Sequence, residues 1–361
     1  MLLQSVGVNC WNQREYPLMF LIVGNRGGTN VAESFARSAQ HLAMPYTFAD
    51  AREAQSDSRL INALCWRLFE RRPARMRAFG RHLLDTAKRV QASYLLTTGL
   101  CPVSADVLKT MRCLGVICLH YSTDDPWNPG QHAKWFLGTL PLYDVVFTPR
   151  TSNMADFVKL GCHQVRYLPF GYDEFIFDTS TQAPVQSNPA EVLFVGGADQ
   201  DRVDFIKVLL AAGLPMALVG GYWERYPLIS GHALGHKTPA ELIQLTRNAS
   251  VNLCLVRRAN RDGHVMRSFE IAALGCCMVV EDTREHRHIF GAEGDCVLYF
   301  NGPEEAAAKI RCLLDAPSER SRLASAVRER ISAGDHTYTH RLLAMLKTSR
   351  ESGSATRHTI L

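Results

Sequence analysis

The sequence lacks long apolar runs and cysteine pairs with CxxC spacing. Its longest apolar runs, Leu18–Val23 and Ile271–Val280, are too short to span a bilayer. The first residues show no basic segment followed by an apolar core and a small-residue cleavage site, so we expect no signal peptide and a cytoplasmic protein. The 11 cysteines are scattered and none has CxxC spacing, so we expect neither a disulfide framework nor a structural zinc.

A strong charge of one sign is also absent. The net charge of +5 permits anionic ligands but does not indicate nucleic acid. Nucleic-acid binding would need aromatic side chains between the basic ones, and the arginine-rich run Arg67–Arg89 offers mainly Trp66, Phe69 and Phe79, which we expect in the core. We interpret this run as a solvated helical face. A surface for anionic lipid or an anionic acceptor is the less favoured interpretation, and with it peripheral membrane contact stays open as the less favoured possibility.

Strand-like and helix-like segments alternate through both halves of the chain. A length of 361 residues with 47% hydrophobic and 21% charged residues suits two globular domains. The polar segment Thr179–Pro189 has no periodicity and reads as a linker. We therefore predict an α/β fold with two doubly wound parallel sheets. The expected boundaries are a first domain at 1–175, a linker at 176–190, a second domain at 191–348 and a disordered tail at 349–361.

The most informative stretch is 262–285, in which a polar loop, a helix, a short apolar strand and a second polar loop follow one another. The helix is expected from His264 to Leu274 and the strand from Cys277 to Val280. A helix N-terminus offers free N–H groups and the positive end of a dipole, which favours a diphosphate. His264 and Arg267 add hydrogen-bond donors there. Ligands of open α/β sheets lie at the carboxyl ends of the strands, where the second loop follows.

Two acids in this stretch suit a nucleotide-sugar. Glu270 lies eight positions after Asp262, and its carboxylate can accept hydrogen bonds from two ribose hydroxyls while the earlier acid addresses the sugar. The alternative is a capped amphipathic helix whose buried acid pairs with Arg267.

The same stretch resembles a known family. Its H-x-M-R-x-F-E-x-x-A-x-G run and the following T-x-E turn are similar to those of the CgeB-like, spore-maturation type of group 1 glycosyltransferases. The first acid departs from that pattern, because it is Asp262 and not the usual Glu. The resemblance implies a GT-B fold, in which two Rossmann-like domains face each other, and metal-independent, hexosyltransferase-like transfer. It implies a donor site in the second domain, formed by Arg202, Asp262, His264, Arg267, Glu270, Thr283 and Glu285.

The first half resembles the family at fewer positions. The segment H-Y-S-T-D-D-P contains His120, Asp124 and Asp125 at a strand end, where one of them could act as a catalytic base. Asp124 could instead only cap the next segment, because an Asp pair before proline is a common turn. A glycine-rich turn between the first strand and helix is the other candidate, since the equivalent GT-B loop faces the inter-domain cleft. Its residues are Gly27, Gly28, Thr29 and Asn30.

We therefore predict a glycosyltransferase that moves a sugar from a nucleotide-sugar to an acceptor, with no resident cofactor and no metal. Retention and inversion both stay open, since retention would need no strong base and Asp124 and Asp125 would then bind substrate. A nucleotide-sugar epimerase on the same fold is one alternative, and a non-catalytic protein that binds a glycan or a partner is another. The two acids of the central stretch argue against the second alternative.

Overall fold

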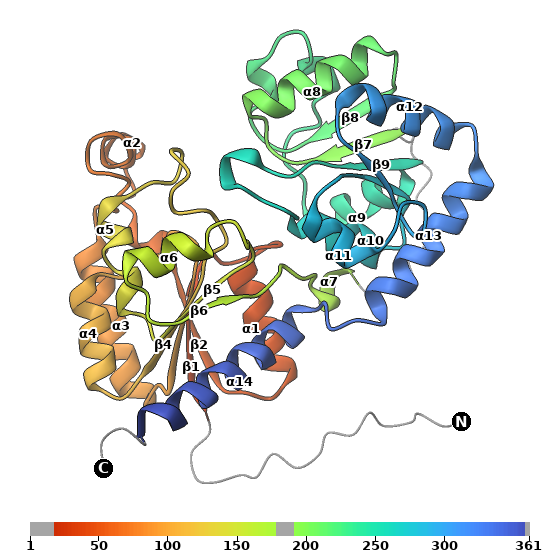
Figure 1. Cartoon of the computed structure of the whole chain (residues 1–361). Helices are drawn as coiled ribbons and strands as arrows, with labels where there is room; N and C mark the ends of the chain where they lie inside the picture. The colour runs from red at the N-terminus through yellow and green to blue at the C-terminus, as the bar shows by residue number, and fades with distance from the viewer. Residues whose placement is uncertain (1–17, 178–190, 358–361) are drawn as a thin grey trace.

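The computed structural model describes residues 18–177 and 191–357, with side chains described to residue 351. The predicted linker, apart from its first two residues, and the last four residues of the predicted tail lie outside these ranges. The described residues form two α/β domains, coloured red to yellow-green and green to blue in Figure 1.

The first domain contains a six-stranded parallel sheet with the order β2-β1-β3-β4-β5-β6. Apolar runs build its strands, and most of the residues in β1, β3, β4 and β5 are buried, as expected for a sheet covered on both faces. Its strands are β1 Phe20–Gly24, β2 Tyr46–Asp50, β3 Tyr94–Thr98, β4 Ile117–Tyr121, β5 Val145–Thr148 and β6 Val165–Tyr167. Its helices are α1 Val31–His41, α2 Arg59–Leu68, α3 Met76–Val90, α4 Ala105–Cys113, α5 Lys134–Leu137, α6 Met154–Leu160 and α7 Glu174–Phe177, with short 3-10 turns η1 Ala51–Ala54 and η2 Leu140–Leu142.

The second domain repeats this pattern with a five-stranded parallel sheet of order β11-β10-β9-β7-β8. Its strands are β7 Val192–Val195, β8 Met216–Val219, β9 Val251–Cys254, β10 Met278–Glu281 and β11 Leu298–Phe300. Its helices are α8 Gln200–Ala211, α9 Pro239–Asn248, α10 Met266–Ala273, α11 Arg284–Phe290, α12 Pro303–Leu314, α13 Pro317–Ser332 and α14 Tyr338–Arg357, with 3-10 turns η3 Trp223–Arg225, η4 Ser230–His232 and η5 Arg258–Asn260.

Strand order reverses at one point in each sheet. The first strand of each domain lies between the second and the third, so the order turns between β1 and β3 in one sheet and between β7 and β9 in the other. Ligands of doubly wound sheets bind outside the carboxyl ends of the strands at such a switch point. The two parallel sheets confirm the predicted fold class.

Two segments differ from the sequence prediction. The polar loop expected after β10 is wrong beyond Thr283, because α11 begins at Arg284 and the Thr283 hydroxyl accepts a hydrogen bond from the His286 N–H. The last helix, α14, continues to Arg357, into the segment 349–361 that was expected to be a disordered tail. Its extension packs on the first domain, where the buried Ser349 hydroxyl donates to the Tyr94 hydroxyl.

Helix α14 carries the chain back from the second domain to the first (Figure 1). The Tyr172 N–H donates to the His336 carbonyl and the Tyr338 N–H donates to the Tyr172 carbonyl, so backbone bonds mark the crossing point. Phe35 of α1 packs edge-on against Tyr338, with ring centroids 5.4 Å apart. One continuous hydrophobic cluster therefore includes residues of both domains.

A candidate active site between the two sheets

A cavity of about 690 Å³ lies between the domains. Its wall includes Asn25 and Thr98, which follow or end β1 and β3, and Val195 and Cys254, which end β7 and β9. The cavity therefore touches the strands on both sides of each switch point. Its volume falls within the usual range for small-molecule sites, roughly 300–1,000 Å³.

The glycine-rich loop after β1 forms part of the first domain's wall. Gly27 and Gly28 have φ angles of 83° and 60°, a left-handed conformation that favours glycine. This turn places Thr29 and Asn30 on the cavity wall, and the Asn30 amide donates to the Gly27 carbonyl at 2.7 Å. Of the four predicted loop residues, two line the cavity and the two glycines shape the turn behind them.

Positive charge dominates the cavity wall. Six arginines and two aspartates lie on it, which suits an anionic ligand. The arginines are Arg71, Arg72 and Arg150 of the first domain and Arg202, Arg257 and Arg267 of the second.

Arg202, in the first turn of α8, is a buried cation on this wall. Its Nη1 donates to the Gly197 carbonyl at 3.0 Å, and its guanidinium lies 5.5 Å from the centre of the Phe194 ring. Its Nε lies 3.8 Å from the Asp199 carboxylate and has no hydrogen-bond partner in the described part of the chain. Burial lowers its pKa. Arg202 therefore contributes a buried positive charge to the cavity wall, which favours an anionic group nearby.

The N-terminus of α10 meets the same space. Val265, Met266 and Arg267 line the cavity, and the first N–H groups of a helix have no partner inside the helix. Arg267 Nη1 lies 2.6 Å from Glu270 Oε2. Glu270 is buried behind this arginine and is not part of the cavity wall, and burial raises its pKa. The pair matches the alternative in which the acid binds Arg267, so a ribose contact of Glu270 stays a prediction.

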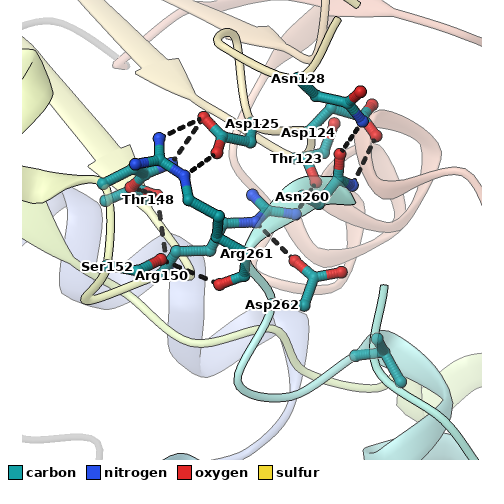
Figure 2. A network of polar contacts seen from close by, with 12 residues as sticks. Thr123, Asp124, Asp125, Asn128, Thr148, Arg150, Ser152, Asn260, Arg261 and Asp262 are labelled. Carbon is teal, nitrogen blue, oxygen red and sulfur yellow. Dashed lines mark hydrogen bonds and ion pairs between the residues drawn. The ribbon is translucent and has the colours of Figure 1, made fainter. Parts of the chain in front are cut away.

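Asp262 binds the other domain. Figure 2 shows Arg150 of the first domain reaching it, with 2.5 Å between Nε and Oδ1. The remaining arginine N–H groups donate to the carbonyls of Ser122 and Thr123 at 3.0 and 2.8 Å. Burial raises the pKa of Asp262 to about 6, although Arg150 opposes the rise. Asp262 lines the cavity, but its carboxylate already has a cationic partner.

Asp125 is also committed to an inter-domain ion pair. Its carboxylate lies 2.5 Å from Arg261 Nε and accepts a second bond from Arg261 Nη2 at 3.0 Å (Figure 2). Arg261 Nη1 pairs with Asp156. Asp125 also accepts the N–H of Trp127. The predicted role of Asp125 as a base is therefore not supported by its position, since a fully paired and buried carboxylate does not face the cavity.

Asp124 is the predicted base that does reach the cavity. One carboxylate oxygen accepts from the Asn260 amide at 3.2 Å, and the Asn128 amide donates to Asn260 at 2.6 Å. Its side chain is half-buried on the first domain's side of the cavity. The Asn260 amide, which belongs to the second domain, thus holds the Asp124 carboxylate at the cavity wall.

His120 is not in the cavity. It lies fully buried inside the first domain, where Nδ1 is 2.8 Å from the Thr97 hydroxyl and its ring packs against Phe136 and Tyr143. Burial lowers its pKa to about 3. The prediction of a catalytic base at this position is corrected: both faces of a parallel sheet are covered, so a strand residue can point away from the ligand side.

The remaining predicted donor residues lie at the domain junction. His264 Nε2 accepts the N–H of Phe170, and burial keeps its pKa well below the usual value. Thr283 caps α11 and its hydroxyl donates to the Gly263 carbonyl. Glu285 accepts a hydrogen bond of 2.6 Å from the Thr151 hydroxyl of the first domain. None of the three belongs to the cavity wall among the described residues.

Sequence reasoning missed several cationic and amide groups of the wall. Arg150 follows β5 by two residues and Arg257 follows β9 by three, so both stand at carboxyl ends of parallel strands. The rule that led to the central stretch would have identified them. Asn260 lies in the loop between β9 and α10, two residues before Asp262.

The site shows no metal-binding cluster. Within residues 18–177 and 191–357, no group of three or more His, Cys, Asp or Glu side chains could hold a metal ion. Metal independence nevertheless stays a prediction.

Comparisons with known proteins agree with this architecture. Residues 202–347 match the family model described as glycosyl transferase-like. Sucrose-phosphate synthase from Thermosynechococcus elongatus superposes with a TM-score of 0.69 at 14% identity, over 93% of this chain and 99% of that one. Anabaena HepE, solved in complex with UDP-glucose, gives a TM-score of 0.65 at 12% identity over 92% and 99% of the two chains. The chain has the GT-B glycosyltransferase fold.

Another solved structure that superposes on this chain has a different assigned activity. A Listeria monocytogenes protein assigned as a UDP-N-acetylglucosamine 2-epimerase superposes with a TM-score of 0.55 at 12% identity, over 93% of this chain and 97% of that one. No curated protein sequence matches the chain. These comparisons establish the GT-B fold. The glycosyl transferase-like match covers only the second domain, including part of α14. Membership of the CgeB-like subgroup stays a prediction.

Proposed function

We propose that the protein transfers a sugar from a nucleotide-sugar to an acceptor, with the diphosphate held on the second domain's side of the cavity. The convergence of Arg202, Arg257 and Arg267 with the N-terminus of α10 carries this proposal. It is supported by the glycosyl transferase-like match and by the fold, which a solved UDP-glucose complex shares.

The arginines suit the chemistry of the leaving group. When the bond from the sugar to the diphosphate breaks, negative charge grows on the phosphate oxygens. Fixed cations and helix N–H groups that face this charge stabilise the transition state more than the bound donor. Arg202 contributes a fixed positive charge to the wall, and the first-turn N–H groups of α10 add neutral donors. No metal is needed in this scheme.

The acceptor would bind on the first domain's side, near Asp124 and the loop that contains Thr29 and Asn30. If transfer inverts the anomeric carbon, Asp124 is the predicted carboxylate positioned to take the acceptor proton. If transfer retains configuration, Asp124 binds an acceptor or sugar hydroxyl. A hexose is the sugar that the family resemblance favours.

The donor site can be tested with two neighbouring arginines. Arg257 lines the cavity, whereas the exposed Arg258 turns away and pairs with Glu281 at 3.3 Å. We expect Arg257→Ala and Arg267→Ala to weaken binding of the preferred nucleoside diphosphate by roughly 10- to 100-fold, from the loss of a charged hydrogen bond. Arg258→Ala is the matched control and should bind as wild type. Isothermal titration with a panel of nucleoside diphosphates measures this, and equal affinity in all four proteins would refute the site.

An epimerase on the same fold predicts a different reaction. It would convert its nucleotide-sugar without an acceptor, whereas a transferase needs one for efficient release of the nucleoside diphosphate. Mass spectrometry of the preferred nucleotide-sugar after incubation with the protein alone distinguishes the two. An isomerised sugar in that sample would favour the epimerase.

A further inference from the structure

Helix α2 leaves an apolar surface uncovered. No residue of α2 is buried, although the helix is rich in leucine. Of the 12 large apolar side chains that are exposed in the described residues, six lie between Leu60 and Phe69. The expectation that Trp66 and Phe69 lie in the core is wrong, because both are among the six. Soluble proteins rarely gather exposed apolar side chains in one place unless something covers them.

The apolar side chains of α2 follow one face. Leu60, Leu64 and Leu68 lie four residues apart, so they share a side of the helix, and Ile61 lies beside them. Their exposed fractions are 84%, 49%, 69% and 45%, in the order Leu60, Leu64, Leu68 and Ile61. The opposite side is formed by Asn62, Cys65 and Trp66, and these three residues line the cavity. Helix α2 thus separates the cavity from solvent and turns its apolar face outward.

The loop after α2 is fixed to the rest of the first domain. Arg71 donates three hydrogen bonds to the carbonyls of Pro129, Gly130 and His132 at 2.5–3.0 Å. The Trp135 indole N–H donates to the Glu70 carbonyl. Figure 1 shows α2 at the opposite end of the first domain from α14. The apolar face therefore belongs to an anchored helix at the edge of the molecule.

Positive charge surrounds this face. Residues 57–81 contain seven arginines and two acids, so this short segment carries a net charge of +5, the same as the whole chain. Arg59, Arg67, Arg72 and Arg77 are exposed. An outward apolar stripe flanked by arginines is the pattern of a helix that lies in a membrane interface. A second copy of the chain would bring two such basic segments together, and like charges oppose that contact.

We propose that α2 docks on an anionic lipid bilayer, with Leu60, Leu64 and Leu68 in the acyl boundary and the neighbouring arginines at the phosphate groups. In this position the wall formed by Asn62, Cys65 and Trp66 lies directly behind the lipid surface. The cavity would then receive an acceptor presented by the membrane. This last point rests on the proposed function, whereas the docking itself does not. No helix among the described residues is long and apolar enough to cross the bilayer.

Sedimentation with phosphatidylcholine vesicles, with and without phosphatidylglycerol, tests the docking. We expect the full chain to bind vesicles that contain phosphatidylglycerol, more weakly at high salt, and to bind pure phosphatidylcholine poorly. Leu60→Glu with Leu64→Glu should lower the partition coefficient by roughly 100-fold, because two inserted side chains are lost. Arg67→Gln with Arg77→Gln should lower it by about tenfold or more, since each removes a charge near the anionic surface.

Leu228→Glu is the matched control. Leu228 lies in the second domain, outside α2, and is 84% exposed, the same fraction as Leu60. Its variant should bind vesicles as wild type. Failure of wild type to bind anionic vesicles, or equal binding by the Leu60/Leu64 variant, would overturn the proposal. Concentration-dependent dimers that the same variant abolishes, without vesicle binding, would assign the surface to a second copy.

Nucleotide binding separates this inference from the proposed function. The Leu60/Leu64 variant should keep the thermal stabilisation that the preferred nucleoside diphosphate gives to wild type, since neither leucine lines the cavity. Vesicle binding without any nucleotide binding would leave the docking in place and remove the transferase proposal.

Discussion

The ion pair between Arg150 and Asp262 gives the sharpest prediction about how the domains stay together. Their side chains are only 1% and 4% exposed, and they join two domains across 112 residues of sequence. Removing one partner leaves the other buried without a countercharge. The two single variants are not equivalent, because a carboxylate can take up a proton whereas a guanidinium keeps its charge near neutral pH.

We expect Asp262→Ala to lower the free energy of unfolding by about 3–5 kcal/mol, the usual cost of leaving one buried ion unpaired. Arg150→Met keeps most of the side-chain volume and should cost less, about 1–3 kcal/mol at pH 7, because Asp262 can be neutralised by a proton. In the double variant neither ion remains. The loss of unfolding free energy in the double variant should therefore be smaller than the sum of the two single losses by about 1–3 kcal/mol.

The cost of Arg150→Met should also depend on pH. The pKa of Asp262 is already raised from 3.8 to about 6 by burial, and removal of Arg150 takes away the cation that opposes this rise. A folded-state pKa above the unfolded value gives stability that is complete below the unfolded pKa and is lost as pH rises through the folded pKa. The variant should therefore approach wild-type stability at pH 5 and fall further behind at pH 8.

Urea unfolding at pH 5, 7 and 8 measures these differences. Asp282→Ala is a suitable control, because Asp282 pairs with Arg287 on the surface and its loss should cause little change. Equal costs for the two single variants at pH 7, or a pH-independent cost for Arg150→Met, would refute the reasoning.

Two further predictions concern the junction around α11. Burial lowers the pKa of His286 to about 4, so the neutral imidazole adds stability that is complete above pH 6.5 and is lost as pH falls through 4. In His286→Gln, the unfolding free energy should therefore change less steeply with pH between 4 and 6.5, by up to about 1.4 kcal/mol per pH unit. Urea unfolding at several pH values measures this slope. In Gly263→Ala the added Cβ would overlap the Glu285 carboxylate, so we expect a lower melting temperature and a larger radius of gyration by X-ray scattering than in Gly231→Ala, where nothing lies within 4 Å of the added atom. An unchanged slope would refute the first prediction, and identical behaviour of the two alanine variants would refute the second.

Most of the fold could be predicted from the sequence because local signals agree with tertiary packing. The start of helix α9, Pro239–Asn248, can be read from the sequence, since Thr238 and Glu241 form a capping box and Pro239 begins the helix. Pro73 likewise lies between α2 and α3, because proline interrupts a helix. The extension of α14 was not predictable, because its support comes from contacts with α1 and β3, which lie far away in the sequence.

The site was predicted less well for the same reason. The motif predicts that Asp262, His264 and Glu285 bind the donor. In the structure each of them contacts the first domain instead, through Arg150, Phe170 and Thr151 respectively. Sequence spacing shows which residues share a helix or a loop end. It does not show whether a carboxylate faces a ligand or a guanidinium that comes from more than 100 residues away.

One loop contributes both to the inter-domain contacts and to the proposed donor site. The segment 257–262 presents Arg257 to the cavity, while Asn260, Arg261 and Asp262 bind the first domain. Since these residues lie within six positions of one another in one short loop, a movement that breaks the inter-domain contacts would also displace Arg257 from the proposed diphosphate site. The inter-domain contacts and the proposed anion site are therefore linked through the backbone of this loop. An Asp262→Ala protein that remains folded should thus bind nucleoside diphosphate more weakly than wild type, even though Asp262 itself would repel the phosphates.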